Sequence, residues 1–126
     1  MAKEYFILYR TTGPIGEIVC CKPDASDMNL LRSLYKWIGC EDIEIAYPSE
    51  YTGPTFRDML MIVDGCGLLK NRDLNPVGVC LYGGPIVGDL IVGRKVIRDG
   101  EPDIGGWDTI EDAEAASTKI WRYRTR

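Results

Sequence analysis

The apolar residues of this chain come in short runs, separated by segments rich in glycine, proline, asparagine and aspartate. The longest runs, Met59 to Val63 and Val77 to Tyr82, fall far short of the roughly 20 residues that a membrane-spanning helix needs. Short apolar runs between turn residues are typical of strands in a small sheet. The length of 126 residues and the mass of 14.1 kDa suit a single domain over residues 1–126.

Several segments have the composition of strands. Residues 3–10 alternate poorly but are rich in aromatic and β-branched side chains, which predicts a strand buried on both faces. Residues 17–21 follow as the second strand of a hairpin. Residues 77–82 fit either a strand or a helical turn, because their length does not decide. The remaining predicted strands are residues 43–47, 58–63, 68–70 and 86–97, the last bent at residues 88–89 and interrupted at residues 93–95.

The segment Asp64-Gly65-Cys66-Gly67 predicts a tight turn. Since Asp-Gly favours positive φ, we expect a hairpin here, with residues 68–70 as the return strand. The segment is too short for a phosphate-binding loop and lacks the pattern of one.

Two segments have helical periodicity, residues 27–38 and residues 109–122. For the first, Ser26 or Asp27 offers an N-cap and Gly39 suits a left-handed C-cap. Several strands and a long C-terminal helix, without regular βαβ alternation, predict an α+β fold. We expect a small, mostly antiparallel sheet with these two main helices.

The C-terminal segment combines a predicted helix with a basic tail. Asp108 is the expected N-cap and Glu111 its capping-box partner. The chain has 15 Lys and Arg against 19 Asp and Glu, a net charge of −4, whereas residues 119–126 hold four basic residues and no acid. Cations at the end of a helix stabilise its dipole, which explains the tail without a ligand. The alternative is nucleic-acid contact through the interleaved residues Arg122, Tyr123, Arg124 and Arg126.

The chain contains no histidine, which excludes Ser-His-Asp triads, Cys-His dyads and histidine-containing zinc sites. None of its cysteines has Cys-x-x-Cys spacing, and we expect neither a metal nor a cofactor. The N-terminus lacks the pattern of a secretory signal, which favours the cytoplasm. In that reducing compartment the five thiols are predicted to be small buried groups, with Cys66 the one candidate for a reactive thiol: Cys20, Cys21, Cys40, Cys66 and Cys80.

A series of segments in fixed order gives the chain a family resemblance. They are residues 31–44, with Leu31, Leu34, Ile38 and Gly39, followed by residues 61–70, 74–76 and 85–92. In order and spacing they resemble the DUF3846 family, small domains of bacteria, phages and mobile elements, over about residues 28–93. The resemblance implies an architecture and no biochemical activity. The acidic pair usual in the family's turn is replaced here by Gly65-Cys66, so the resemblance assigns no role to such acids.

The candidate site residues are polar or amphipathic side chains near predicted turns, where the rim of the sheet should lie. Within the family-like segments they are Asp64, Lys70, Asn75, Tyr82 and Asp89. The loop over residues 48–57 adds two aromatic candidates, Tyr51 and Phe56, which could instead fold back onto the sheet. Asp64, Asn75 and Asp89 have structural alternatives as turn, cap and bulge residues, and a Mg²⁺ or Ca²⁺ site built from them rests only on the general preference for oxygen ligands.

Small size, acidic charge, the lack of histidine and the family resemblance favour a non-enzymatic accessory protein of a phage or mobile element. We expect it to bind a protein partner, as an inhibitor or regulator. One alternative is binding of a nucleotide or other small anion at the glycine-rich turns, and another is nucleic-acid contact through the tail. Net negative charge disfavours nucleic acid, no membrane contact is expected, and edge strands leave a homodimer open.

Overall fold

The computed structural model describes residues 3–13, 15–21, 28–67 and 69–125. Within these residues the chain forms a six-stranded sheet in the order β2-β1-β5-β4-β3, with β6 paired to β5 and every pairing antiparallel. The predicted α+β fold is therefore confirmed. The strands are β1 (Glu4–Tyr9), β2 (Glu17–Cys21), β3 (Ile43–Ala46), β4 (Met59–Asp64), β5 (Leu90–Arg98) and β6 (Glu101–Gly105). The helices are α1 (Met28–Ile38), α2 (Pro76–Tyr82) and α3 (Ile110–Arg124).

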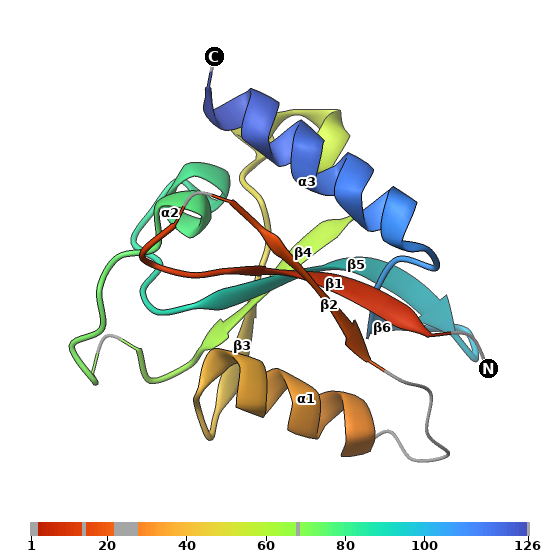
Figure 1. Ribbon diagram of the computed structural model, residues 1–126, viewed down its shortest axis with the longest axis horizontal. Coiled ribbons are helices and arrows are strands. Elements are labelled where there is room, and N and C mark those ends of the chain that lie inside the picture. The colour runs from red at the N-terminus through yellow and green to blue at the C-terminus, as the bar shows by residue number, and fades with distance from the viewer. Residues whose placement is uncertain (1–2, 14, 22–27, 68, 126) are drawn as a thin grey trace.

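Helices cover both faces of the sheet (Figure 1). On one face, Leu34 and Ile38 of α1 pack into a cluster with Phe6 of β1. On the other, Ile120 of α3 packs into a cluster with Ile7 of β1, and α2 joins the same layer. The central strands β1, β5 and β4 contribute buried side chains to both clusters. The prediction that the first strand is buried on both faces is thus confirmed.

The end of α1 is the one that the sequence predicts. Gly39 follows the helix with a φ of 72°, and its N–H donates to the carbonyl of Tyr35 at 2.8 Å. Glycine reaches this left-handed conformation without the clash that a Cβ would cause. The N-cap candidates Ser26 and Asp27 lie outside the described residues.

α3 begins one residue later than expected. Its N-cap is Thr109 and not Asp108, because the Thr109 hydroxyl accepts a hydrogen bond from the N–H of Asp112 at 3.1 Å. The predicted partner Glu111 is accordingly the second residue of the helix and not the third, which is the position that a capping box requires. α3 has an acidic first turn and a basic last turn, as the helix dipole favours. No helix in the described ranges is long and apolar enough to cross a membrane.

Residues 77–82, which fit either a strand or a helical turn by sequence, belong to the helix α2. Asn75 caps it: the side-chain oxygen accepts hydrogen bonds from the N–H groups of Val77 and Gly78 at 3.1 and 3.2 Å. Pro76 suits the first turn, where its missing N–H would have no partner within the helix. Gly83 ends the helix in the left-handed conformation, with a φ of 82°. The two capping residues explain why this segment is a helix and not a strand, a choice that the spacing of its apolar residues does not determine.

The predicted hairpin after β4 is wrong. β4 pairs with β3 and β5, and the described residues 69–71 form turns instead of a return strand. Gly65 does not adopt a positive φ, which falls instead on Asn71, at 57°. The Asp64 side chain organises the turn, because its Oδ1 accepts a hydrogen bond from the N–H of Cys66 at 2.9 Å.

The predicted interruption at residues 93–95 is also wrong, since β5 continues through Gly93. A Cβ at this position would lie 2.7 Å from the carbonyl oxygen of Gly105 and 3.2 Å from the Phe6 ring. Glycine here permits close packing and does not break the strand. The bend predicted at residues 88–89 is present, with Gly88 at a φ of 82°.

The sequence analysis missed a hairpin between β5 and β6. Arg98 pairs with Glu101 across a two-residue turn, in which Asp99 and Gly100 have φ values of 51° and 78°. Both values are positive, as hairpin turns of this kind require. The Asp-Gly turn therefore exists in this protein, but it follows β5 and not β4.

We expect Gly100→Ala to destabilise the protein by about 1 kcal/mol, because the left-handed conformation costs alanine about 1–2 kcal/mol and the stiffer unfolded chain offsets part of it. Gly13→Ala is the control. An added Cβ meets no atom within 4 Å at either position, but only Gly100 has a positive φ. Urea unfolding followed by circular dichroism measures both variants, and equal unfolding free energies would contradict the conformational explanation.

Candidate functional site

Asp64 is a buried carboxylate at the end of β4. Its side chain is 0% exposed, and its Oδ2 lies 3.0 Å from Nζ of Lys70 and 2.9 Å from Nε of Arg72. These two cations reach the surface, with side chains 40% and 29% exposed. One buried negative charge thus holds two positive charges at the rim of the sheet.

The surroundings of Asp64 keep it ionised. Burial alone raises the pKa of this carboxyl, because the charged form loses water. The N–H of Cys66 and the charges of Lys70 and Arg72 act in the opposite direction and prevail, so the pKa of Asp64 lies below its ordinary value of 3.8. At neutral pH the carboxylate is therefore charged and available to both cations.

Arg72 ties the segment after β4 to the end of α1. Its Nη2 donates a hydrogen bond to the carbonyl of Gly39 at 2.7 Å. Its Nε is buried and has no hydrogen-bond partner in the described part of the chain, so its contact with Asp64 is an ion pair only. A Cβ at Gly88 would lie 2.9 Å from Cδ of Arg72, which leaves little room for the side chain to move. Arg72 therefore has a structural role: its guanidinium group contacts Asp64 and the carbonyl of Gly39.

A shallow, open depression of about 710 Å³, which we call the basic groove, lies beside this cluster. Its lining includes Arg32, Tyr35 and Lys36 of α1, Cys40 just after this helix, and Lys70 from the segment after β4. Burial raises the pKa of the Cys40 thiol, so the residue is a neutral, apolar part of the lining. The basic groove therefore combines three cations with one aromatic ring.

Two of the three cations of the basic groove, Arg32 and Lys36, are poorly compensated, whereas Lys70 is paired with Asp64. Arg32 and Lys36 lie one helical turn apart, a spacing at which like charges destabilise a helix by about 0.2–0.5 kcal/mol. Neither forms an ion pair with a carboxylate among the described residues. Among the described residues that line the groove, Glu41 is the one acid. An arrangement that repels itself in this way is complementary to an anion.

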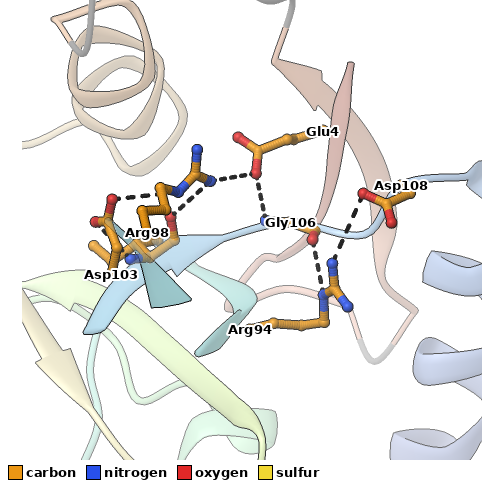
Figure 2. Close-up of polar contacts among 7 residues, drawn as sticks. Glu4, Arg94, Arg98, Asp103, Gly106 and Asp108 are labelled. Atoms are coloured by element: carbon orange, nitrogen blue, oxygen red, sulfur yellow. Dashed lines mark hydrogen bonds and ion pairs between the residues drawn. The ribbon is translucent and has the colours of Figure 1, made fainter. Parts of the chain in front are cut away.

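A second charged cluster lacks this excess (Figure 2). Arg98 pairs with Glu4 at 2.6 Å and with Asp103 at 3.3 Å. Arg94 donates a hydrogen bond to the carbonyl of Gly106 at 2.8 Å and lies 4.0 Å from Asp108. Because each arginine faces carboxylates or carbonyls, the cluster has no surplus positive charge. It fastens the segment after β6 to β1.

Asn75 is a structural residue in the described fold. The residue is 0% exposed, and its side-chain amide donates hydrogen bonds to the carbonyls of Tyr9 and Gly88 at 2.9 and 3.0 Å. Its oxygen caps α2, so every polar atom of the side chain is engaged. The structural alternative considered from sequence, a capping asparagine, accounts for it.

The other candidates are scattered. Asp89 accepts a hydrogen bond from the N–H of Thr11 at 3.0 Å and pairs with Arg10 at 3.6 Å. Tyr82 and Tyr51 are 44% and 89% exposed, away from the lining of the basic groove. Phe56 is buried in the core, so it folds back onto the sheet and offers no surface. Of the sequence candidates, Asp64 and Lys70 meet in one cluster, and analysis of the sequence missed Arg32, Tyr35, Lys36 and Arg72.

The C-terminal residues belong to α3. Tyr123 packs edge to face against Phe56, with ring centroids 5.3 Å apart, so it contributes to the core. Arg122 is exposed and Arg124 is partly buried. Arg126 lies outside the described residues. Interleaving of aromatic and basic residues here follows from one helix with a buried face and an exposed face.

The remaining chemistry is sparse. Among the described residues no group of three or more Cys, Asp or Glu side chains could hold a metal ion. A pocket of about 250 Å³ on the α3 side is lined by uncharged residues, including Tyr9 and Trp121. The five cysteines, all within the described ranges, form no disulfide; Cys21 and Cys40 are buried as predicted, Cys80 is partly buried and Cys20 is exposed. Cys66 is partly exposed, with Sγ 4.0 Å from a carboxylate oxygen of Asp42.

No family model and no curated protein matches this sequence. The fold is similar to part of the crystal structure of small RNA methyltransferase HEN1, with a TM-score of 0.61 and 14% sequence identity. The similarity covers 92% of this chain and 16% of the HEN1 chain. At this identity it shows a shared fold. The chain thus spans a small part of the protein that it resembles.

This likeness overturns the expectation of an accessory protein that acts by binding a protein partner. The fold occurs as one part of a small RNA methyltransferase. The resemblance to the DUF3846 family stays a prediction, because no family model matches.

We expect Asn75→Ala to lower the free energy of unfolding by about 2–3 kcal/mol. The variant loses the cap of α2, which costs about 1 kcal/mol, and leaves two buried carbonyls without a donor, which costs about 1–3 kcal/mol. Asn75→Ser is the matched control, because its hydroxyl can still cap α2 while the amide donors are lost, and it places no charge beside the carbonyls of Tyr9 and Gly88. Denaturant unfolding should place Asn75→Ser between wild type and Asn75→Ala if both contributions operate.

Asp64 should also make stability depend on pH. Its pKa is lowered on folding, so its stabilising contribution is complete above the unfolded value of 3.8 and is lost as pH falls through the folded value. Asp64→Asn should cost about 1–2 kcal/mol at neutral pH, less than a fully buried pair because both cations reach solvent. The difference from wild type should shrink as pH falls from about 5 toward about 2. A difference that is constant with pH would show that the charge of Asp64 does not stabilise the fold.

Proposed function

We propose that this chain binds RNA through the basic groove. The observation that carries the proposal is that Arg32, Lys36 and Lys70 line one depression together with Tyr35, on an otherwise acidic protein. Phosphates would relieve the repulsion among these cations, since nucleic-acid affinity rests largely on such contacts. The fold likeness to part of a small RNA methyltransferase supports RNA over other polyanions.

Tyr35 favours a single strand over a duplex. Proteins that bind single-stranded nucleic acid combine a basic groove with aromatic rings on which unpaired bases stack. Tyr35 is half-buried and borders the basic groove together with two α1 cations, so a stacked base would place its phosphates near them. The bases of a duplex are already stacked on one another and cannot use the ring in this way.

The net charge of −4 limits the strength of binding but not its place. Three phosphate contacts give a weak, salt-sensitive interaction, so we expect a dissociation constant of about 10⁻⁴–10⁻⁶ M, the usual range for non-specific binding. The proposal departs from the sequence-based expectation that disfavoured nucleic acid, because that expectation used total charge and not its distribution. That the chain has no enzyme activity of its own, and that it works in the cytoplasm, stay predictions.

The proposal is tested by fluorescence anisotropy with a labelled single-stranded RNA of about 16 nucleotides, the upper end of the site size of small single-strand binders. For wild type, log K should fall with log salt concentration with a slope of about −2, since each phosphate contact adds about −0.7. Lys36→Met and Lys70→Met should each weaken binding and reduce the slope by about 0.7. An RNA duplex and a DNA strand of the same sequence are the comparison probes.

Lys119→Met is the matched control, because it removes the same charge from exposed α3 on the other face of the sheet. It should bind RNA as wild type does. A loss of affinity in Lys119→Met as large as in Lys36→Met would place the interface in the C-terminal helix and contradict the basic groove. Absence of salt-dependent binding by folded wild type would contradict RNA binding altogether.

A further inference from the structure

We propose that Asp64 is the positioning residue of the basic groove, and that it acts by holding the ammonium group of Lys70 at the edge of the groove. This inference rests on the proposed RNA binding and names the side chain that organises the interface. Asp64 itself is 0% exposed and touches no ligand, so its effect on RNA passes through Lys70.

The carboxylate is a rigid anchor. Asp64 is the last residue of β4 and pairs in register with Ile43 of β3. Its Oδ1 is fixed by the N–H of Cys66, so Oδ2 points in one direction. The side chain of Lys70 is long and flexible and would otherwise sample many rotamers, so ordering it on binding costs conformational entropy. Because the buried carboxylate already holds the lysine, most of this entropy is lost on folding and little more is lost when RNA binds.

Lys70 retains binding capacity while it is held. Its ammonium group has three N–H donors, and one of them is directed to Oδ2 of Asp64 at 3.0 Å. The side chain is 40% exposed and lines the basic groove, so the remaining donors can meet a phosphate. Arg72 matches the charge of Asp64 from the inner side, where it also binds the carbonyl of Gly39. The positive charge of Lys70 is thereby left over for a ligand.

The direction of the effect separates this inference from simple electrostatics. Asp64→Asn removes a negative charge next to the basic groove, so charge alone predicts tighter binding of RNA. Loss of the anchor predicts weaker binding, because Lys70 is no longer held. We expect Asp64→Asn to weaken binding about threefold, the size of effect of a partly exposed ion pair. Tighter or unchanged binding would overturn the inference.

A double-mutant cycle tests whether Asp64 acts through Lys70. We expect the pair Asp64→Asn and Lys70→Met to bind RNA no more weakly than Lys70→Met alone, because the anchor has nothing left to hold. Asp64→Asn combined with Lys36→Met should show additive losses. Additive losses in both cycles would indicate a general structural effect and overturn the positioning role. Circular dichroism and thermal unfolding confirm that each variant is folded at the assay temperature.

The anchor can also be tested in the wild-type protein without RNA, by the rate at which its lysines are acetylated. In wild type, Lys70 should react with an acetylating N-hydroxysuccinimide ester about threefold more slowly than Lys36, because its amine is held by a carboxylate and that of Lys36 is not. Peptide mass spectrometry measures both sites in one sample. Equal reaction rates would overturn the anchor. If folded wild type binds no RNA, the proposed function fails, and the acetylation rates still decide whether Asp64 holds Lys70.

Discussion

Burial of both faces of the central strands is the constraint on which the rest of this structure depends. Side chains of β1, β5 and β4 enter two separate apolar clusters, so the sheet is stable only when α1 covers one face and α3 with α2 the other. With both faces covered, polar chemistry is confined to the ends of strands and helices. The basic groove lies at such a place, where α1 ends and the chain leaves β4.

The sequence predicted the elements that are encoded locally. The both-face burial of the first strand, the glycine after α1 and the last helix follow from composition and caps, and they are present. Of the two Asp-Gly pairs, the sequence predicted a hairpin at Asp64-Gly65 and made no prediction for Asp99-Gly100. Asp99-Gly100 forms the hairpin, whereas Asp64 uses its carboxylate inside the fold and Gly65 keeps a negative φ. Asp64 has this role because Lys70 and Arg72 fold back onto its carboxylate. The turn preferences of Asp-Gly take no account of such contacts with residues further along the chain.

The candidate site was predicted only in part, for a similar reason. Asp64 and Lys70 were candidates because both are polar residues near a predicted turn within the family-like segments. Arg32 and Lys36 look like the solvent-exposed side of a helix, which is the ordinary place for basic residues. Their significance comes from Lys70 on a different segment, and only the packing of α1 beside the turn after β4 brings the three together. Asn75 was a site candidate because the sequence alone does not distinguish an asparagine that caps a helix in the core from one that binds a ligand.

The chain between β4 and α2 is fastened at both ends and in its middle. Asp64 holds its beginning, Arg72 joins it to the carbonyl of Gly39, and the carbonyl of Asp73 accepts a hydrogen bond from the N–H of Gly88 at 2.8 Å. Because this connecting segment is attached at three points, a change in its length would break at least one of these contacts. Insertions and deletions in relatives of this protein should therefore be rare here and concentrate in the loop over residues 48–57, which makes the spacing between the aspartate and the asparagine a marker by which such relatives can be recognised.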